Sequence, residues 1–191
     1  MDESTPLREI KSADSTPLKT SACEEEVEPT ILTLHDDHIS QNGEPLYDSE
    51  SSNTSRSLVF YLVHPLNSHY RTDKPAYFAT CAKESGLGNI ELNIESKGLS
   101  KTKYKVLLSA GRSASSDPLF YNPPTTALSA KTKFVGGKYF WTDSQGQTIA
   151  QEALTSDDKP QLKIMQAMQT NFRDAVVAAW CLRIWSQIWN D

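Results

Sequence analysis

The C-terminal segment constrains the fold of this chain more than any other feature. Residues 175–189 read Ala-Val-Val-Ala-Ala-Trp-Cys-Leu-Arg-Ile-Trp-Ser-Gln-Ile-Trp, in which Arg183, Ser186 and Gln187 alone are polar. A helix that is apolar on every side is either buried within a protein or placed in a membrane. About 15 residues at 1.5 Å each span about 22 Å, which is short of a hydrocarbon core of about 30 Å. The segment therefore predicts a helix that is buried inside the protein.

The start of this helix has its own signals. Asn171 is a residue type that caps helices, and Asp174 follows three residues later, where a capping-box carboxylate sits near the positive end of the dipole. We therefore expect a helix over 171–189. The core positions that we expect on it are Val177, Trp180, Leu182, Ile184 and Trp185, with Ala178 and Ala179 allowing close approach of the surrounding wall.

The body before this helix has the periodicity of β-structure. Ile90, Leu92 and Ile94 alternate with polar residues, which predicts a half-buried strand with one wet face. The apolar run 58–63 predicts a fully buried strand, and Asn42-Gly43 predicts a hairpin turn. Further strands are expected at 30–34, 76–82, 104–108, 131–134, 138–142, 148–150 and 162–165, with a Ser- and Pro-rich loop over 111–126. We predict a mainly β (α+β) domain over 30–191.

Residues 1–29 differ from this body in composition. They contain no aromatic residue and hold eight acidic and three basic side chains, whereas the rest of the chain holds sixteen of each sign. Such a segment cannot bury enough apolar surface to offset the entropy of ordering, so a disordered acidic tail is expected. Thr5 and Thr16 each precede proline within a repeated Ser-Thr-Pro-Leu, which suits a proline-directed kinase, although coincidence in a Ser/Thr/Pro-rich tail is an alternative.

Cysteine usage and targeting features indicate the compartment. Cys23, Cys81 and Cys181 are odd in number and widely spaced, which disfavours a disulfide framework and favours a reducing compartment. The N-terminus has no basic n-region followed by an apolar h-region, and no run of 18 apolar residues occurs. We expect a cytoplasmic protein without a transmembrane span. Because the body is not basic overall, nucleic acid is not an expected partner.

The residues that commonly carry catalysis or bind metals occur in unfavourable patterns. His35-Asp36-Asp37-His38 would divide its side chains between two faces of a strand, so turn chemistry is favoured over a metal site. His64 and His69 flank a turn and have no neighbouring acid to orient them. No nucleophile elbow, phosphate-binding glycine loop or HExxH motif occurs. We expect no enzyme activity, no cofactor and no metal.

Lysines form the one pattern that indicates binding. Lys97, Lys101, Lys103 and Lys105 occur without an intervening acid, and the last three alternate so that a strand would place them on one face. A second group contains Lys131 and Lys133, together with Lys138. Anionic lipid headgroups are a natural ligand, since each lysine near a membrane surface contributes about 1 kcal/mol. The alternative is a solvated sheet edge on which lysines discourage strand pairing.

Three pieces of the chain together resemble the tubby C-terminal-like superfamily, in particular its small fungal members and the related LURP-one proteins. They are 34–39 followed by Pro45-Leu46-Tyr47, the aromatic stretch 139–142 with Gly146 and Ala150, and Asp174 with the apolar run after it. The resemblance covers about 30–189, and 65–130 has no counterpart. It implies a closed antiparallel β-barrel around the C-terminal helix, and tubby domains proper bind phosphoinositides through basic residues on the barrel.

Two functions from different classes follow from these expectations. The first is a non-enzymatic module, cytoplasmic or peripheral at membranes, that binds anionic phospholipid or a partner protein through its lysine-rich face. The second is a structural or regulatory protein whose phosphorylatable tail is the functional part and whose barrel is a carrier.

Overall fold

The computed structural model describes residues 29–34, 39–41, 44–45, 59–66, 68, 75–82, 84, 86–95, 102–121, 123–132 and 138–188. These residues form eleven strands and one helix. The strands are β1 (Thr30–Leu34), β2 (Ile39–Gln41), β3 (Glu44–Pro45), β4 (Phe60–Val63), β5 (Tyr77–Cys81), β6 (Gly88–Glu95), β7 (Lys103–Ala110), β8 (Thr125–Thr132), β9 (Tyr139–Asp143), β10 (Thr148–Leu154) and β11 (Pro160–Ile164), and the helix is α1 (Thr170–Ile188). The prediction of a mainly β fold with a C-terminal helix is confirmed.

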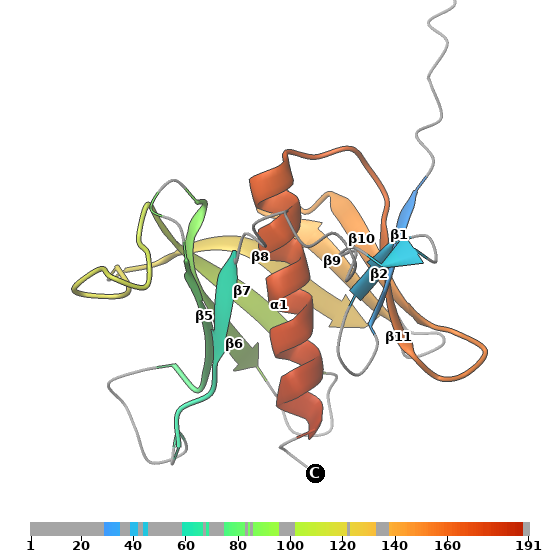
Figure 1. The fold of residues 1–191 in the computed structure, drawn as a ribbon, viewed down its shortest axis with the longest axis horizontal. Helices are drawn as coiled ribbons and strands as arrows, with labels where there is room; N and C mark the ends of the chain where they lie inside the picture. Colours follow the sequence, from blue (N-terminus) through green and yellow to red (C-terminus); the bar gives the residue numbers. More distant parts are fainter. Residues whose placement is uncertain are drawn as a thin grey trace, which may run out of the picture.

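All strands belong to one antiparallel sheet with the order β3-β2-β1-β11-β10-β9-β8-β7-β6-β5-β4. From β4 to β11 each strand pairs with the next one in the chain, which is the simplest antiparallel arrangement. The N-terminal strand β1 breaks this order because it pairs with β11, with Leu32 opposite Leu162. Figure 1 shows the result, a strongly curved sheet with α1 across its concave side.

The expectation of a closed barrel is wrong, because the sheet is open. Within the described ranges no strand pairing joins β3 to β4, the two strands at the ends of the sheet order. The edge strands explain this in physical terms. β3 has two residues, and one of them, Pro45, has no backbone N–H to donate to a further strand. β4 has four residues, so neither edge offers a long ladder for closure.

Helix α1 begins one residue earlier than the capping argument predicts. The carbonyl oxygen of Gln169 accepts hydrogen bonds from the backbone N–H groups of Phe172 and Arg173, at 3.1 and 2.9 Å. Gln169 is therefore the cap position, and the assignment of this role to Asn171 is wrong. Asp174 lies beyond the first turn and not at the capping-box position.

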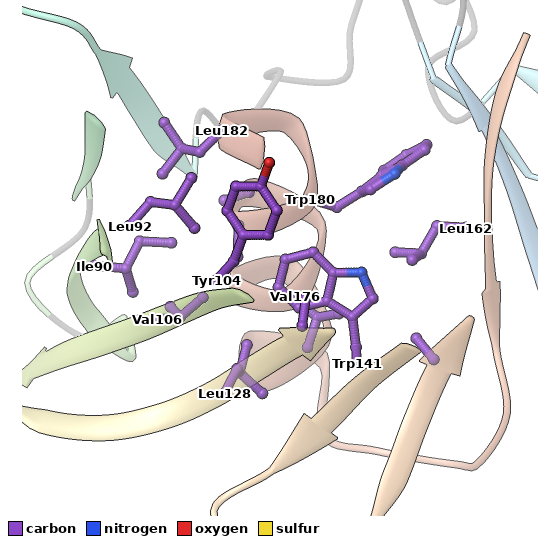
Figure 2. Close-up of a cluster of buried hydrophobic side chains, with 14 of the residues drawn as sticks. Ile90, Leu92, Tyr104, Val106, Leu128, Trp141, Leu162, Val176, Trp180 and Leu182 are labelled. Atoms are coloured by element: carbon purple, nitrogen blue, oxygen red, sulfur yellow. The ribbon is translucent and has the colours of Figure 1, made fainter. Parts of the chain in front are cut away.

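One side of α1 is buried against the sheet, so the helix contributes to the core but is not enclosed on all sides as predicted. Trp180 and Leu182 are fully buried, and Ala178 and Ala179 pack into the same cluster. Figure 2 shows Val176, Trp180 and Leu182 of the helix among core side chains contributed by the strands. Val177, Ile184 and Trp185 are half-buried, which corrects the expectation of full burial. An open sheet cannot surround a helix on all sides, and this accounts for the difference.

Two strand predictions are also corrected. The apolar run that predicted a fully buried strand forms β4, an edge strand in which Tyr61 is 49% and Leu62 39% exposed. The loop expected over 111–126 ends earlier, since β8 begins at Thr125 and pairs on both sides. The predicted Asn42-Gly43 hairpin agrees with the pairing of Gln41 with Glu44.

Some predicted features lie outside the described residues. They include the tail up to residue 28 with Thr5 and Thr16, the cluster His35-Asp36-Asp37-His38, and His69. In the part of the chain that the structure describes, no helix is both long and apolar enough to cross a membrane.

Candidate functional site

The outer, convex face of the sheet carries the lysines that the sequence singles out. Along β7, Tyr104 and Val106 are buried in the core, so the alternating residues Lys103 and Lys105 face outward. The register places Lys131 of β8 directly opposite Lys103 and places Ser129 opposite Lys105. The structure thus brings together three of the six lysines proposed for lipid binding: the spacing predicted the shared face of Lys103 and Lys105, and the register adds Lys131.

These three lysines, which we call the basic patch, differ in their neighbours. The Lys105 Nζ lies 2.5 Å from Oε1 of Glu95, so the charge of Lys105 is balanced on the adjacent strand. Lys103 and Lys131 have no ion-pair partner among the described residues, although they face each other across neighbouring strands. Like charges directly opposite one another destabilise a sheet. Glu95 also lies directly opposite Lys103 on β6, so Lys103 and Lys105 share one carboxylate and the three lysines of the patch keep an excess of two positive charges over it.

The remaining lysines of the predicted site, Lys97, Lys101 and Lys133, lie outside the described residues. In the chain, the first two belong to the connection between β6 and β7, and the third to the connection between β8 and β9. The alternative of lysines on a protective sheet edge is wrong for the patch itself. Both β7 and β8 are interior strands with neighbours on each side.

A second polar cluster lies at the inner face and was not predicted from the sequence. Arg183 of α1 donates from Nη2 to Oε2 of Glu152 on β10 at 2.5 Å, and both side chains are buried. The Trp141 indole N–H donates to the other oxygen of this carboxylate, Oε1, at 2.8 Å. The charged pair thus connects the helix to the sheet. A lone arginine in an otherwise apolar buried helix is the sequence signal that indicates such a partner.

Aromatic rings complete this inner cluster. The Arg183 guanidinium lies 4.5 Å above the ring centre of Tyr139 and 5.9 Å from that of Tyr104. Burial raises the pKa of the Tyr139 phenol to about 12, with a further contribution from Tyr104, so this hydroxyl remains protonated at neutral pH. Burial also raises the pKa of Glu152, and the charge of Arg183 opposes this effect.

A cavity of about 360 Å³ opens beside this cluster. It lies between the start of β9, the end of β10 and the C-terminal half of α1. Its lining comprises Lys138, Tyr139, Glu152, Ala153, Leu154, Arg183 and Gln187. It combines charged, amide and apolar groups within a small volume.

The described histidine and cysteine side chains have structural surroundings and not those of a reactive site. His64 hydrogen-bonds through Nδ1 to the carbonyl oxygen of Ala76 at 2.7 Å and stacks on Tyr77, which agrees with the expectation of a satisfied histidine. Burial raises the pKa of the Cys181 thiol to about 12, which makes it a poor nucleophile at neutral pH. Among the residues with described positions, no group of three or more potential ligands could hold a metal ion.

Comparison of the chain with protein-family models, with curated proteins and with solved structures yields no match. The geometry of the two clusters is therefore the basis of the functional argument.

Proposed function

We propose that this domain is a non-catalytic binding module whose outer face docks onto anionic phospholipid surfaces. The observation that carries the proposal is the direct opposition of Lys103 and Lys131 on adjacent interior strands, in a patch whose three lysines exceed the charge of the neighbouring Glu95 by two. Their repulsion costs stability in the free protein. An anionic surface relieves this repulsion and gains about 1 kcal/mol for each lysine near it.

The position of the patch supports docking to a surface over binding in a cleft. Lys103 and Lys105 alternate with core residues of β7, and Lys131 of β8 lies opposite Lys103, so all three lysines are on the face of the sheet that points away from the core. Lys97, Lys101 and Lys133 belong to the two connections that adjoin these strands, and we include them in the proposed site. In this proposal the protein is cytoplasmic and peripheral at membranes. A tubby-like ancestry is part of the same proposal, supported by the antiparallel sheet that curves around a C-terminal helix.

Vesicle cosedimentation tests the proposal. Vesicles of phosphatidylcholine with about 30% phosphatidylserine should retain the protein at low salt, and raising the salt to 0.5 M should release it because the patch is exposed and screened. Pure phosphatidylcholine vesicles should not retain it. The double variant Lys103→Ala/Lys131→Ala should lose about 2 kcal/mol of binding, or about 30-fold in affinity.

A charge-matched control separates the patch from net charge. The double variant Lys159→Ala/Arg173→Ala removes two positive charges from the turn before β11 and from α1, and it should bind like the parent. Equal weakening by the two double variants would show that overall charge decides binding. Failure of the parent to bind anionic vesicles at low salt would eliminate the proposed function.

A further inference from the structure

The cavity beside Glu152 and Arg183 has no role in the function proposed above. Arg183 is 4% exposed, and a buried arginine with an incomplete set of partners is uncommon. Its Nη2 donates to Glu152, and its Nη1 donates to Oε1 of Gln187 at 2.6 Å. The buried Nε has no hydrogen-bond partner among the described residues. Since a guanidinium has five N–H donors, the protein leaves part of this capacity unused.

The charges around the cavity favour an anion as its occupant. Glu152 balances Arg183, and both oxygens of its carboxylate already accept a hydrogen bond. Lys138 is exposed at the cavity wall, and its amine has no carboxylate partner in the described parts of the chain. The lining therefore keeps one positive charge in excess. The Tyr139 phenol also lines the wall, and its hydroxyl is hydrogen-bonded to Tyr104.

Apart from the Gln187 amide, the rest of the wall is apolar. Ala153 and Leu154 line the cavity, and Leu154 is 62% exposed although it is a large aliphatic residue. A volume of about 360 Å³ is near the lower limit of pockets that enclose small ligands. An inorganic anion would leave this apolar part of the wall in water, whereas a ligand with a short hydrocarbon body would cover it.

We propose that the cavity binds a small organic acid, with its carboxylate at Lys138 and Arg183 and its apolar body against Leu154. Arg183 already binds one carboxylate through its Nη2, that of Glu152, and charge-assisted hydrogen bonds of this kind are about twice as strong as neutral ones. The site shares no residue with the basic patch, so the two proposals stand or fall separately.

Isothermal titration calorimetry with sodium hexanoate tests the site in the full-length protein. Hexanoate should bind saturably at one site, and the neutral counterpart hexanamide should bind at least about tenfold more weakly because it lacks the charge. Inorganic phosphate should also bind at least about tenfold more weakly because it covers no apolar wall. Hexanoate that fails to saturate by about 50 mM, or that binds no tighter than either of the other two probes, overturns the proposal.

Variants locate the binding. Lys138→Ala should weaken hexanoate at least about fivefold, whereas Lys163→Ala on the outer face of β11 should leave it within about twofold. Arg183→Lys keeps the charge but removes the fork, and it should weaken hexanoate in a protein with an unchanged circular dichroism spectrum. If Arg183→Lys does not fold, the Lys138→Ala result decides. Unchanged affinity in Lys138→Ala contradicts the site.

Discussion

Gly88 occupies a backbone conformation that side chains rarely adopt. Its φ is 132°, and a Cβ there would lie 2.3 Å from the carbonyl oxygen of Ser109 on the neighbouring strand. Because that oxygen is part of the backbone, it cannot move away cheaply. Gly88→Ala should lower the free energy of unfolding by at least about 2 kcal/mol in urea denaturation. Gly146→Ala is the matched control, since its φ is 82° but nothing lies within 4 Å, and it should cost about 1 kcal/mol. Equal losses would contradict the steric argument.

Trp180 is the largest buried side chain of α1, and its indole is enclosed by the core. Truncation to alanine leaves a cavity, and the surrounding helix and sheet cannot move far enough to fill it. Trp180→Ala should cost about 3–5 kcal/mol by urea denaturation, enough to unfold a marginal domain. Val177→Ala, at a half-buried position on the same helix, should cost less. A Trp180→Ala protein that melts like the parent would show that α1 is not part of the core.

The raised pKa of Glu152 predicts a pH-dependent contribution to stability. Burial favours the protonated carboxyl in the folded state, so this contribution is fully present below the ordinary value of 4.5 and is lost as the pH rises through the folded pKa. Glu152→Gln cannot titrate but keeps an acceptor for Trp141. The difference in unfolding free energy, parent minus Glu152→Gln, should therefore decrease as the pH is raised from 4.5. A difference that stays constant or increases would mean that the ion pair with Arg183 outweighs burial.

For the strands, the sequence period predicted which side chains share a face better than it predicted which strands are neighbours in the sheet. The alternation over Lys101, Lys103 and Lys105 placed the last two on one face of β7, because side-chain direction along a strand is local geometry. The apolar run that became β4 could not be separated from a central strand, because an edge position depends on pairing with distant residues. β8 was largely missed, since its sequence Thr-Thr-Ala-Leu-Ser-Ala-Lys-Thr has a weak apolar alternation.

For the candidate sites too, the sequence predicted local features but not the contacts between residues distant in the chain. Lys103 and Lys131 were both named from the sequence, but their direct opposition arises from the register of β7 and β8. The pairing of Glu152 with Arg183 joins residues 31 positions apart on different elements. The sequence indicates that Arg183 needs a partner, yet the choice among the carboxylates of the chain depends on the fold. The cavity beside them was therefore beyond prediction.

Asn89 couples strand β6 to the loop between β7 and β8. Its fully buried side chain accepts from the backbone N–H of Cys81 at 2.8 Å and donates to the carbonyl oxygens of Ser113 and Leu119, at 3.0 and 2.8 Å. Asn89→Ala removes these three hydrogen bonds from a buried site, so the unfolding free energy should fall by about 1–3 kcal/mol. Hydrogen exchange should show faster exchange of the Cys81 amide. Asn89→Asp keeps the acceptor and should preserve more of that protection, and equal exchange rates in the two variants would contradict this role.

For the whole molecule, the sequence predicted an antiparallel β domain with a C-terminal helix in its core, but it did not predict an open sheet. Strand alternation and the apolar helix are local patterns. Closure depends on whether the two edge strands meet, and the short β3 with Pro45 ends the sheet on one side. The resemblance that implied a barrel includes Pro45 at this edge, but a short sequence match does not determine whether β3 meets β4.

The acidic tail gives a prediction at the same scale. Deleting residues 1–29 should leave the thermal midpoint unchanged, because a segment of this composition contributes no core. The 30–191 fragment should bind anionic vesicles better than the full chain, since the tail carries charge opposite to that of the basic patch. Phosphate on Thr5 or Thr16 adds about −1.5 to −2 charge each and should widen the difference. A loss of stability on deletion would mean that the tail supplies part of the fold.

The pairing of β1 with β11 sets a condition on how the chain folds during synthesis. The side chains of Thr33 and Gln161, hydrogen-bonded across these strands, are 128 residues apart in the chain. At about 5–20 residues per second, a ribosome needs about 6–26 s to make the intervening segment. The strand β1 therefore cannot pair with β11 until β11 has been synthesised. The helix α1, which contributes Trp180 to the core, is synthesised after β11. Over this interval the nascent strands lack the helix that covers their apolar face, so the core can be completed only after synthesis has reached α1.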